Sequence, residues 1–468
     1  MPAAIARTDH ASDGLFAPGR RALSVGLVLT ITLVASESLA VGTVMPLVAR
    51  DLGQLELYGW VFSAFFLGSL IGIVVVGGLI DRAGLRRPLA GGLALFATGL
   101  VIGGLTPSMP ILVVGRFIQG LGAGTIPPIA YVAIGRTLPE SLRARMFAVL
   151  STAWVLPGIF GPAIAGFVGD TIGWRWVFLG LLPLIAVAGA MTLWAVGSVP
   201  PGAPEEHTLA QATSRRLPLA LLVTAGAAVA LGGLTAGEPL VALAGLVLGA
   251  VLGLPAFRRL CPPGTLRLAR GLPSAVGLRG VLTFGFFAAD AYIAFLLIDY
   301  RGVSAAAAGL ALTAATLTWT SGAWVQARTI ERVGARRLVG TGFVVVACGV
   351  LATMAVLSPS VPWPLAIVTW GIAGFGMGLS YSPLSLLVLR DATAGSEGTA
   401  TSALQLSDTL GTALGTGVGG ALLAAAARVD AADWVGLAAT FALGLVVLAF
   451  GGLMSRRLAG PVTIEARV

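Results

Sequence analysis

Long apolar runs with almost no charge inside them recur along the whole chain. A run of about 20 apolar residues matches the length of helix that crosses the roughly 30 Å hydrocarbon core of a bilayer. Backbone polar groups find no water in that core, so such runs fold as membrane-spanning helices. Fourteen runs fit this description, at 22–48, 57–80, 88–106, 109–134, 144–168, 174–197, 217–235, 239–258, 273–299, 304–327, 338–357, 363–389, 398–426 and 433–455.

The composition indicates an all-α integral membrane protein. Hydrophobic residues make up 57% of the chain and charged residues 10%. A soluble domain carries about 25% charged residues, so this chain could not cover a water-facing surface. The net charge of +9 is interpreted as charge beside a membrane, and no nucleic-acid partner is expected.

The residue types exclude several kinds of reactive site. All 29 basic residues are arginine, so the chain has no lysine for a phosphate-binding loop or a Schiff base. His10 and His207 are isolated, and neither belongs to a cluster that could bind a catalytic metal. Cys261 and Cys348 show no arrangement for a disulfide. We therefore expect a protein that is not an enzyme and that needs no cofactor.

The arginines also indicate an orientation. With the N-terminus placed inside, 24 arginines fall on the inner side, Arg279 among them, and 4 fall outside. Positive charge concentrates on the cytoplasmic side of membrane proteins. The count therefore predicts a multi-pass protein of the plasma membrane with both termini cytoplasmic and an even number of spans. It does not separate twelve spans from fourteen, because the pair at 217–258 enters and leaves on the same side.

An internal repeat indicates two related halves. The segments 81–87 and 331–337 share an acid, a glycine and three arginines in register, 250 residues apart. The glycines of 120–124 recur at 374–378, 254 residues apart. Parallel repeats of this kind place a substrate site between two bundles near the midplane. We predict two six-helix bundles joined by an inserted two-helix hairpin, 14 transmembrane helices in all. The expected divisions are a cytoplasmic N-terminal tail at 1–21, a first bundle at 22–199, cytoplasmic linkers at 200–271 with the hairpin at 217–258, a second bundle at 272–457 and a cytoplasmic tail at 458–468.

The loop after the second run carries a specific motif. Its residues are Gly77, Asp81, Arg82, Gly84, Arg86 and Arg87, with Glu331 and Arg332 as counterparts in the repeat. The motif resembles the loop signature of the major facilitator superfamily, although Leu85 stands where that family has a basic residue. An acid that faces a helix N-terminus or an arginine can hold two elements together in one state only. We predict such a conformational latch; the alternative is that the arginines only orient the loop.

Glu37 lies about 15 residues into the first run and nine residues before Pro46. This spacing resembles the first-span signature of the fourteen-span drug:proton antiporters, which have an aspartate there. A carboxylate near the bilayer midplane is costly, so we interpret Glu37 as a group that binds and releases protons. The alternative is a carboxylate fixed in a hydrogen-bond network with no role in transport.

Arg116 begins the sequence Arg-Phe-Ile-Gln-Gly in the fourth run. It resembles the superfamily's fourth-span signature, and the resemblance implies a part in proton coupling. A guanidinium cannot lose its proton, so Arg116 would tune a carboxyl group rather than carry the proton. Its repeat partner is Trp370, so the arginine belongs to one bundle only. The alternative is a helix-packing arginine bound to backbone carbonyls.

Gly161, Pro162 and Gly166 in the fifth run resemble the antiporter signature Gly-Pro-x-x-Gly-Gly, with Ala165 replacing one glycine. The resemblance implies exchange of substrate for another solute. From physics alone, small residues allow close approach of a facing helix and the proline bends its own helix. A close-packing face without further function is therefore the alternative.

Asp290 and Asp408 are the other acids within the runs. Both are costly in a membrane, and either could bind a cationic substrate or carry a second proton.

Together these features predict a proton-coupled antiporter that exports hydrophobic, sometimes cationic, small molecules. The proton motive force would drive it, with protons, substrate and membrane lipids as its partners. The alternatives are a lipid or lipid-conjugate exporter of the same fold, a proton-coupled uptake symporter, and a membrane-embedded enzyme or scaffold that transports nothing.

Overall fold

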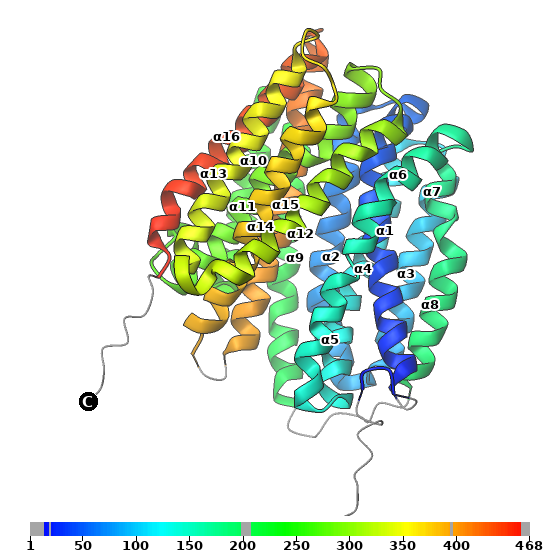
Figure 1. Cartoon of the computed structure of the whole chain (residues 1–468), viewed down its shortest axis with the longest axis vertical. Coiled ribbons are helices and arrows are strands. Elements are labelled where there is room, and N and C mark those ends of the chain that lie inside the picture. The colour runs from blue at the N-terminus through cyan, green and yellow to red at the C-terminus, as the bar shows by residue number, and fades with distance from the viewer. Residues whose placement is uncertain (1–13, 18–19, 198–206, 394–395, 460–468) are drawn as a thin grey trace, which may run out of the picture.

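The computed structural model describes residues 14–17, 20–197, 207–393 and 396–459, and these residues form helices and no β-strand. The helices run side by side along one direction (Figure 1). Eight of them form the first bundle: α1 (Arg21–Leu52), α2 (Tyr58–Ala83), α3 (Arg86–Leu105), α4 (Met109–Thr137), α5 (Glu140–Thr152), α6 (Val155–Thr171), α7 (Arg175–Leu179) and α8 (Leu181–Val196).

A second bundle follows a pair of helices in the middle of the chain. The pair is α9 (His207–Thr235) and α10 (Pro239–Leu260). The second bundle comprises α11 (Leu272–Phe295), α12 (Ala305–Val333), α13 (Ala335–Met354), α14 (Leu365–Asp391), α15 (Glu397–Arg428) and α16 (Asp433–Met454). Helix α11 continues through a wider turn over Leu296–Tyr300.

The two bundles repeat one packing pattern. In the first bundle, Gly120 of α4 lies against the backbone of α2 at Phe65, and Gly122 lies against α3. In the second bundle, Gly374 of α14 lies against the backbone of α12 at Ala315, and Gly376 lies against α13. The glycine echo in the sequence therefore reflects close approach of the same three helices in each half.

Twelve helices in the described residues are long and apolar enough to cross a membrane, and α6 is a shorter apolar helix of the same kind. Two of the fourteen expected runs are absent from the twelve. The run at 144–168 is divided into α5 and α6 by a turn at Ala153 and Trp154. The run at 304–327 forms the continuous α12, but threonines and serines lower its hydropathy.

We call the end of the molecule where α1 begins the inner end and the opposite end the outer end. Helices α1 and α11 begin at the inner end, whereas α2 and α12 begin at the outer end (Figure 1). Glycines with positive φ end α2 at Gly84 (69°) and α12 at Gly334 (86°). Left-handed backbone of this kind favours glycine, which explains why both repeat loops carry one.

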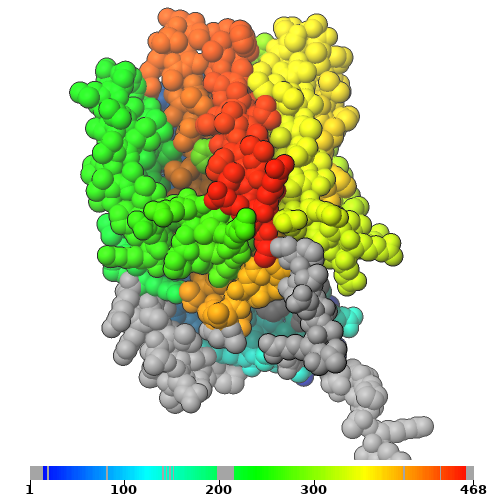
Figure 2. Space-filling model, turned by 90° about the vertical axis from the view of Figure 1, so that its left-hand side faces the viewer, coloured from blue at the N-terminus to red at the C-terminus, as the bar shows by residue number. Residues whose placement is uncertain are grey.

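Helices α9 and α10 pack closely on each other beside the two bundles (Figure 2). Gly233 of α9 and Gly245 of α10 meet backbone to backbone where the helices cross. At the outer end of α9, Thr235 accepts a hydrogen bond from the Trp60 indole of α2 at 3.0 Å. The backbone carbonyl of Thr235 accepts another from Arg428 of α15. Helix α9 is thus bound to both bundles.

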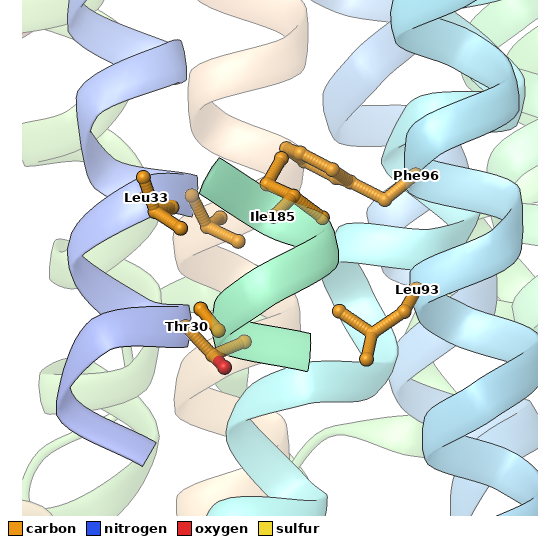
Figure 3. Close-up of a pocket in the computed structure, with 7 residues that line it drawn as sticks. Thr30, Leu33, Leu93, Phe96 and Ile185 are labelled. Atoms are coloured by element: carbon orange, nitrogen blue, oxygen red, sulfur yellow. The ribbon is translucent and has the colours of Figure 1, made fainter. Parts of the chain in front are cut away.

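A small apolar pocket lies inside the first bundle, between α1, α3 and α8 (Figure 3). Leu33, Leu93, Phe96 and Ile185 contribute to its lining. The single hydroxyl in the lining, that of Thr30, is already hydrogen bonded to Thr192 at 2.9 Å. This pocket therefore presents no free polar group to a ligand.

Candidate functional site

Glu37 and Arg116 form an ion pair inside the first bundle. Glu37 lies midway along α1, and Arg116 lies two turns from the outer end of α4. A guanidinium nitrogen of Arg116 donates to the Glu37 carboxylate, and the two side chains are 3% and 1% exposed. Removing one member of such a pair would leave an uncompensated charge in a low dielectric. The structure therefore brings together the two residues that the first and fourth runs singled out.

Three other groups hold the guanidinium of Arg116. Its Nη1 donates to the side-chain oxygen of Gln119 at 2.6 Å, and its Nε donates to the Val61 carbonyl at 3.2 Å. The guanidinium lies 4.3 Å from the centre of the Phe65 ring. Gln119 lies one turn along α4 from Arg116, which accounts for the Arg-x-x-Gln spacing. The second carboxylate oxygen of Glu37 has no hydrogen-bond partner among the described residues.

Asp290 of α11 has a neutral partner. Its carboxylate accepts a hydrogen bond from the indole of Trp370 on α14 at 2.9 Å. The indole is fully buried and stacks on Phe286 with 5.1 Å between ring centroids. Trp319 of α12 meets the same Phe286 ring edge-on at 5.7 Å. Asp290 therefore borders a group of aromatic rings, and no ion pair to it occurs in the described part of the chain.

Asp408 of α15 belongs to a second buried cluster that also contains Arg279. The Tyr381 hydroxyl donates to Asp408 at 2.8 Å, and the Arg279 guanidinium lies 3.9 Å from the same carboxylate. Arg279 stacks 3.4 Å from the centre of the Tyr381 ring and donates to Ser385 at 2.5 Å. Asp408 thus has a nearby cation within the second bundle, while its Oδ1 and the Nε of Arg279 have no hydrogen-bond partner among the described residues.

Arg279 is a correction to the sequence analysis, which counted it with the inner-side loop arginines. Its side chain is 3% exposed and faces α14 and α15. Two signals were available: Arg279 falls inside the run at 273–299, and an acid, Asp408, falls inside another run. Each charge makes the other less costly in the membrane.

Two residues of the segment that resembles the antiporter signature contact the second bundle where α6 meets α12. The backbone of Pro162 lies against Gly309, and Gly166 lies against the backbone of Ala305. A side chain at Gly166 would collide with that backbone. Gly161, by contrast, faces α1, and its nearest neighbours there lie 4.0 Å from where a Cβ would be. Pro162 and Gly166 therefore make the close contact between bundles, and Gly161 does not.

The outer ends of the bundles are joined by polar contacts that sequence reasoning missed. Arg50 at the end of α1 donates to Asp299 of the second bundle at 2.5 Å. The carboxylate of Asp170, near the end of α6, accepts from the backbone N–H groups of Ala305 and Ala306 at 3.3 and 3.1 Å. A carboxylate at the start of α12 is favoured by the exposed N–H groups and the helix dipole. These residues lie in or beside spans at loop ends, where a sequence offers no distinguishing pattern.

The structure describes the side chains of only some residues of the predicted latch. The backbone of Asp81 and Arg82 lies in α2, but their side chains are outside the described part. Arg86, Arg87, Glu331 and Arg332 are exposed at the inner end. No ion pair joins these four side chains to another described residue. The latch therefore stays a prediction.

Comparison with known proteins decides the family. Residues 26–416 match the model of the Major Facilitator Superfamily. The chain belongs to the Major Facilitator Superfamily. It is 26% identical to the multidrug transporter protein MdtP of Bacillus subtilis, over 86% of this chain and 75% of that one. It is also 26% identical to a probable multidrug-efflux transporter of Mycobacterium tuberculosis, over 93% of this chain and 94% of that one.

The fold agrees with this family. The crystal structure of the POT family transporter PepTSo superposes with a TM-score of 0.67, covering 92% of this chain and 97% of that chain at 17% identity. Such a likeness concerns the fold alone. Family membership makes the chain a membrane transporter rather than an enzyme, as the absence of lysine and of a metal cluster in the sequence had indicated.

Proposed function

We propose that this chain exports hydrophobic small molecules, including cationic ones, in exchange for protons. The relatives named as multidrug transporters support export of drug-like molecules. The observation that carries the proton coupling is the buried pair of Glu37 and Arg116. In this pair, the carboxyl group of Glu37 can change its charge by binding a proton, whereas the guanidinium of Arg116 cannot lose its own.

Proton uptake by Glu37 would change the charge of the α1–α4 interface by one unit. Its second carboxylate oxygen, which has no partner among the described residues, is a place for that proton. Arg116 would keep its charge and its bonds to Gln119 and Val61. Helix α1 also contacts α11 and α12 of the second bundle. A change at Glu37 can therefore bias how the two bundles sit against each other.

Residues of the second bundle would recognise the substrate. Asp290 has no cationic partner in the described residues, and the partly buried ring of Trp319 lies near it, against the buried rings of Phe286 and Trp370. Aromatic faces and a carboxylate together favour an apolar cation. We propose Asp290 as the substrate-facing acid. We propose Asp408 as a structural acid, because the Arg279 cation lies 3.9 Å from it and Tyr381 donates a hydrogen bond to it.

The bundles are joined at their outer ends by Arg50 with Asp299 and by Asp170 with the start of α12. We propose that this is the state in which the site opens to the inner, cytoplasmic side. Transport then requires the outer contacts to break while the inner ends close. Coupling requires only that proton and substrate stabilise the two states to different extents.

The test is transport of a lipophilic cationic dye in proteoliposomes under an imposed pH gradient. The parent should move the dye against its concentration gradient, and an uncoupler should abolish this movement. Glu37→Gln should abolish gradient-driven movement, because glutamine cannot exchange a proton. Glu238→Gln at the α9–α10 turn is the control and should transport as the parent does. The proposed coupling is overturned if Glu37→Gln transports equally well with the same dependence on pH.

The same assay separates the two other transport functions. A lipid exporter would show competition between the dye and long-chain lipids. An uptake symporter would move the dye in the same direction as the protons, whereas an antiporter would move it in the opposite direction.

We propose that α9 and α10 form a transmembrane hairpin inserted between the bundles, giving fourteen spans with α5–α6 and α12 included. Helix α12 has 29 residues and packs along α6 and α14. Its hydroxyl groups at Thr316, Thr320 and Ser321 donate to backbone carbonyls one turn earlier in the same helix, which makes them compatible with a membrane span. A reporter fused at Glu238 should then lie outside, with both termini cytoplasmic. A reporter that lies inside would show that the pair does not cross.

A further inference from the structure

A basic pocket lies at the inner end of the second bundle, away from the site described above. It has a volume of about 410 Å³ and is lined by Arg336, Arg337, Gly340, Ser455 and Arg456. Three of these five residues are arginines, and no carboxylate is among them. The three guanidinium groups form no ion pair with a described residue. The pocket therefore concentrates positive charge that the protein leaves uncompensated there.

The start of α13 lies at this pocket. The helix begins at Ala335, and its N-cap residue, Gly334, has no side chain that could accept from the first N–H groups. Arg336 and Arg337 stand in the first turn, where N–H groups have no partner within the helix. Two of the lining residues, Gly340 and Ser455, lie close together, because a Cβ on Gly340 would lie 2.9 Å from the Ser455 hydroxyl oxygen. Guanidinium groups beside a helix N-terminus are well suited to bind a phosphate group.

An apolar, exposed surface continues from the pocket along the same two helices. Val344 lies one turn beyond Gly340 on α13 and is 57% exposed. Leu453 lies one turn before the pocket residue Arg456 on α16 and is 60% exposed. In a membrane, side chains exposed at this position meet acyl chains. A ligand with both a phosphate and acyl chains would contact the whole surface, whereas free phosphate would contact only the pocket.

From this juxtaposition we propose that the pocket binds the headgroup of an anionic phospholipid, with its acyl chains along Val344 and Leu453. Basic pockets between transmembrane helices on the inner side are suited to such headgroups. The lipid would bridge the start of α13 and the end of α16. The proposal does not depend on what the protein transports.

The experiment measures lipid retention and thermal stability of the purified full chain in detergent, with phosphatidylglycerol as the probe. Phosphatidylcholine and inorganic phosphate are tested in parallel. The variant replaces Arg336, Arg337 and Arg456 by glutamine. The matched control replaces Arg258 and Arg259, two exposed arginines at the inner end of α10, in the same way. Circular dichroism and gel filtration confirm that each variant is folded and monodisperse.

We expect phosphatidylglycerol to be retained and to raise the melting temperature of the parent and the control, and phosphatidylcholine to do neither. The triple variant should bind phosphatidylglycerol roughly a hundredfold more weakly, given the contribution of each basic residue beside an anionic lipid. Three results would overturn the proposal: equal stabilisation by inorganic phosphate alone, equal binding of both lipids, or an equal loss in the Arg258/Arg259 control. If the triple variant fails to fold, single replacement of Arg456 serves, with an expected loss of about fivefold.

Discussion

Trp370 donates a hydrogen bond to Asp290 at the place where, in the first bundle, Arg116 donates to Glu37. Asp290 follows Glu37 by 253 residues, and Trp370 follows Arg116 by 254. The repeat therefore keeps the carboxyl group and its donor but replaces a permanent cation by a neutral indole. Glu37 has a cationic partner inside its own bundle, whereas Asp290 has none among the described residues.

Asp290→Asn should weaken transport of cationic substrates selectively. The variant keeps the size of the side chain and an acceptor for Trp370 but loses the charge. We expect the KM for a cationic dye to rise about tenfold, and that for a neutral substrate to change by less than about twofold. Initial rates over a concentration series measure both. Equal effects on the two substrates would show that Asp290 acts on folding or on the proton instead.

The Arg279–Asp408 cluster should behave as a structural unit. Asp408→Asn would leave the buried guanidinium of Arg279 without a carboxylate and should destabilise the protein by about 3–5 kcal/mol. The double variant Arg279→Met/Asp408→Leu should recover most of that loss, because it removes both charges. Thermal unfolding in detergent measures each variant, with Asp391→Asn as a control near the inner end. A double variant no more stable than Asp408→Asn would contradict this interpretation.

The α6–α12 contact predicts opposite outcomes for two glycines of one motif. Gly166→Ala places a methyl group against the backbone of Ala305, which should weaken the outer contact by about 1–3 kcal/mol. Gly161→Ala meets no atom closer than 4.0 Å and should transport as the parent does. Spin labels at Thr171 and Ser360, two exposed positions at the outer ends, on a background without cysteine, report the distance between the bundles there. A longer distance is expected for Gly166→Ala only; a longer distance for both would contradict the assignment.

Cys261 should be unreactive at neutral pH. It lies just beyond the end of α10, and burial raises the pKa of its thiol to about 12. The reactive thiolate is therefore scarce near pH 7 in the folded protein, while an unfolded chain exposes a thiol of ordinary pKa. Alkylation by a water-soluble maleimide should be slow in the folded Cys348→Ser variant and complete in dodecyl sulfate. Because this folded pKa is raised, stability linked to the protonated thiol is fully present below about pH 9 and is lost progressively as the pH rises to about 12. Rapid alkylation of the folded Cys348→Ser variant would show that the segment around Cys261 opens to solvent.

Much of the fold was accessible from sequence because the membrane limits the choices. Apolar run length predicts helices, and the glycine echo at 120–124 and 374–378 predicted that the halves are related. The structure confirms the helical fold and explains the echo by helix approach. Hydropathy alone could not describe α12, whose Thr316, Thr320 and Ser321 hydroxyls donate to backbone carbonyls of their own helix.

The sequence predicted site residues only where they belong to a recognisable motif. Glu37 and Arg116 were found separately, but their pairing across 79 residues depends on how α1 packs on α4. Arg279 was misplaced because counting loop charges cannot recognise an arginine that is neutralised by another helix. Arg50, Asp299 and Asp170 carried no signal, since their contacts exist only once the bundles meet.

The binding of α9 to both α2 and α15 makes the two flanks of the molecule unequal. Both junctions are packed through glycines, with Gly59 against Gly420 at α2–α15 and Gly166 against Ala305 at α6–α12. Of the two, the α2–α15 junction is bordered by a helix, α9, that touches each side. Separation of Gly166 from Ala305 would therefore open the α6–α12 flank directly to the surrounding bilayer, whereas α9 would still border the α2–α15 flank.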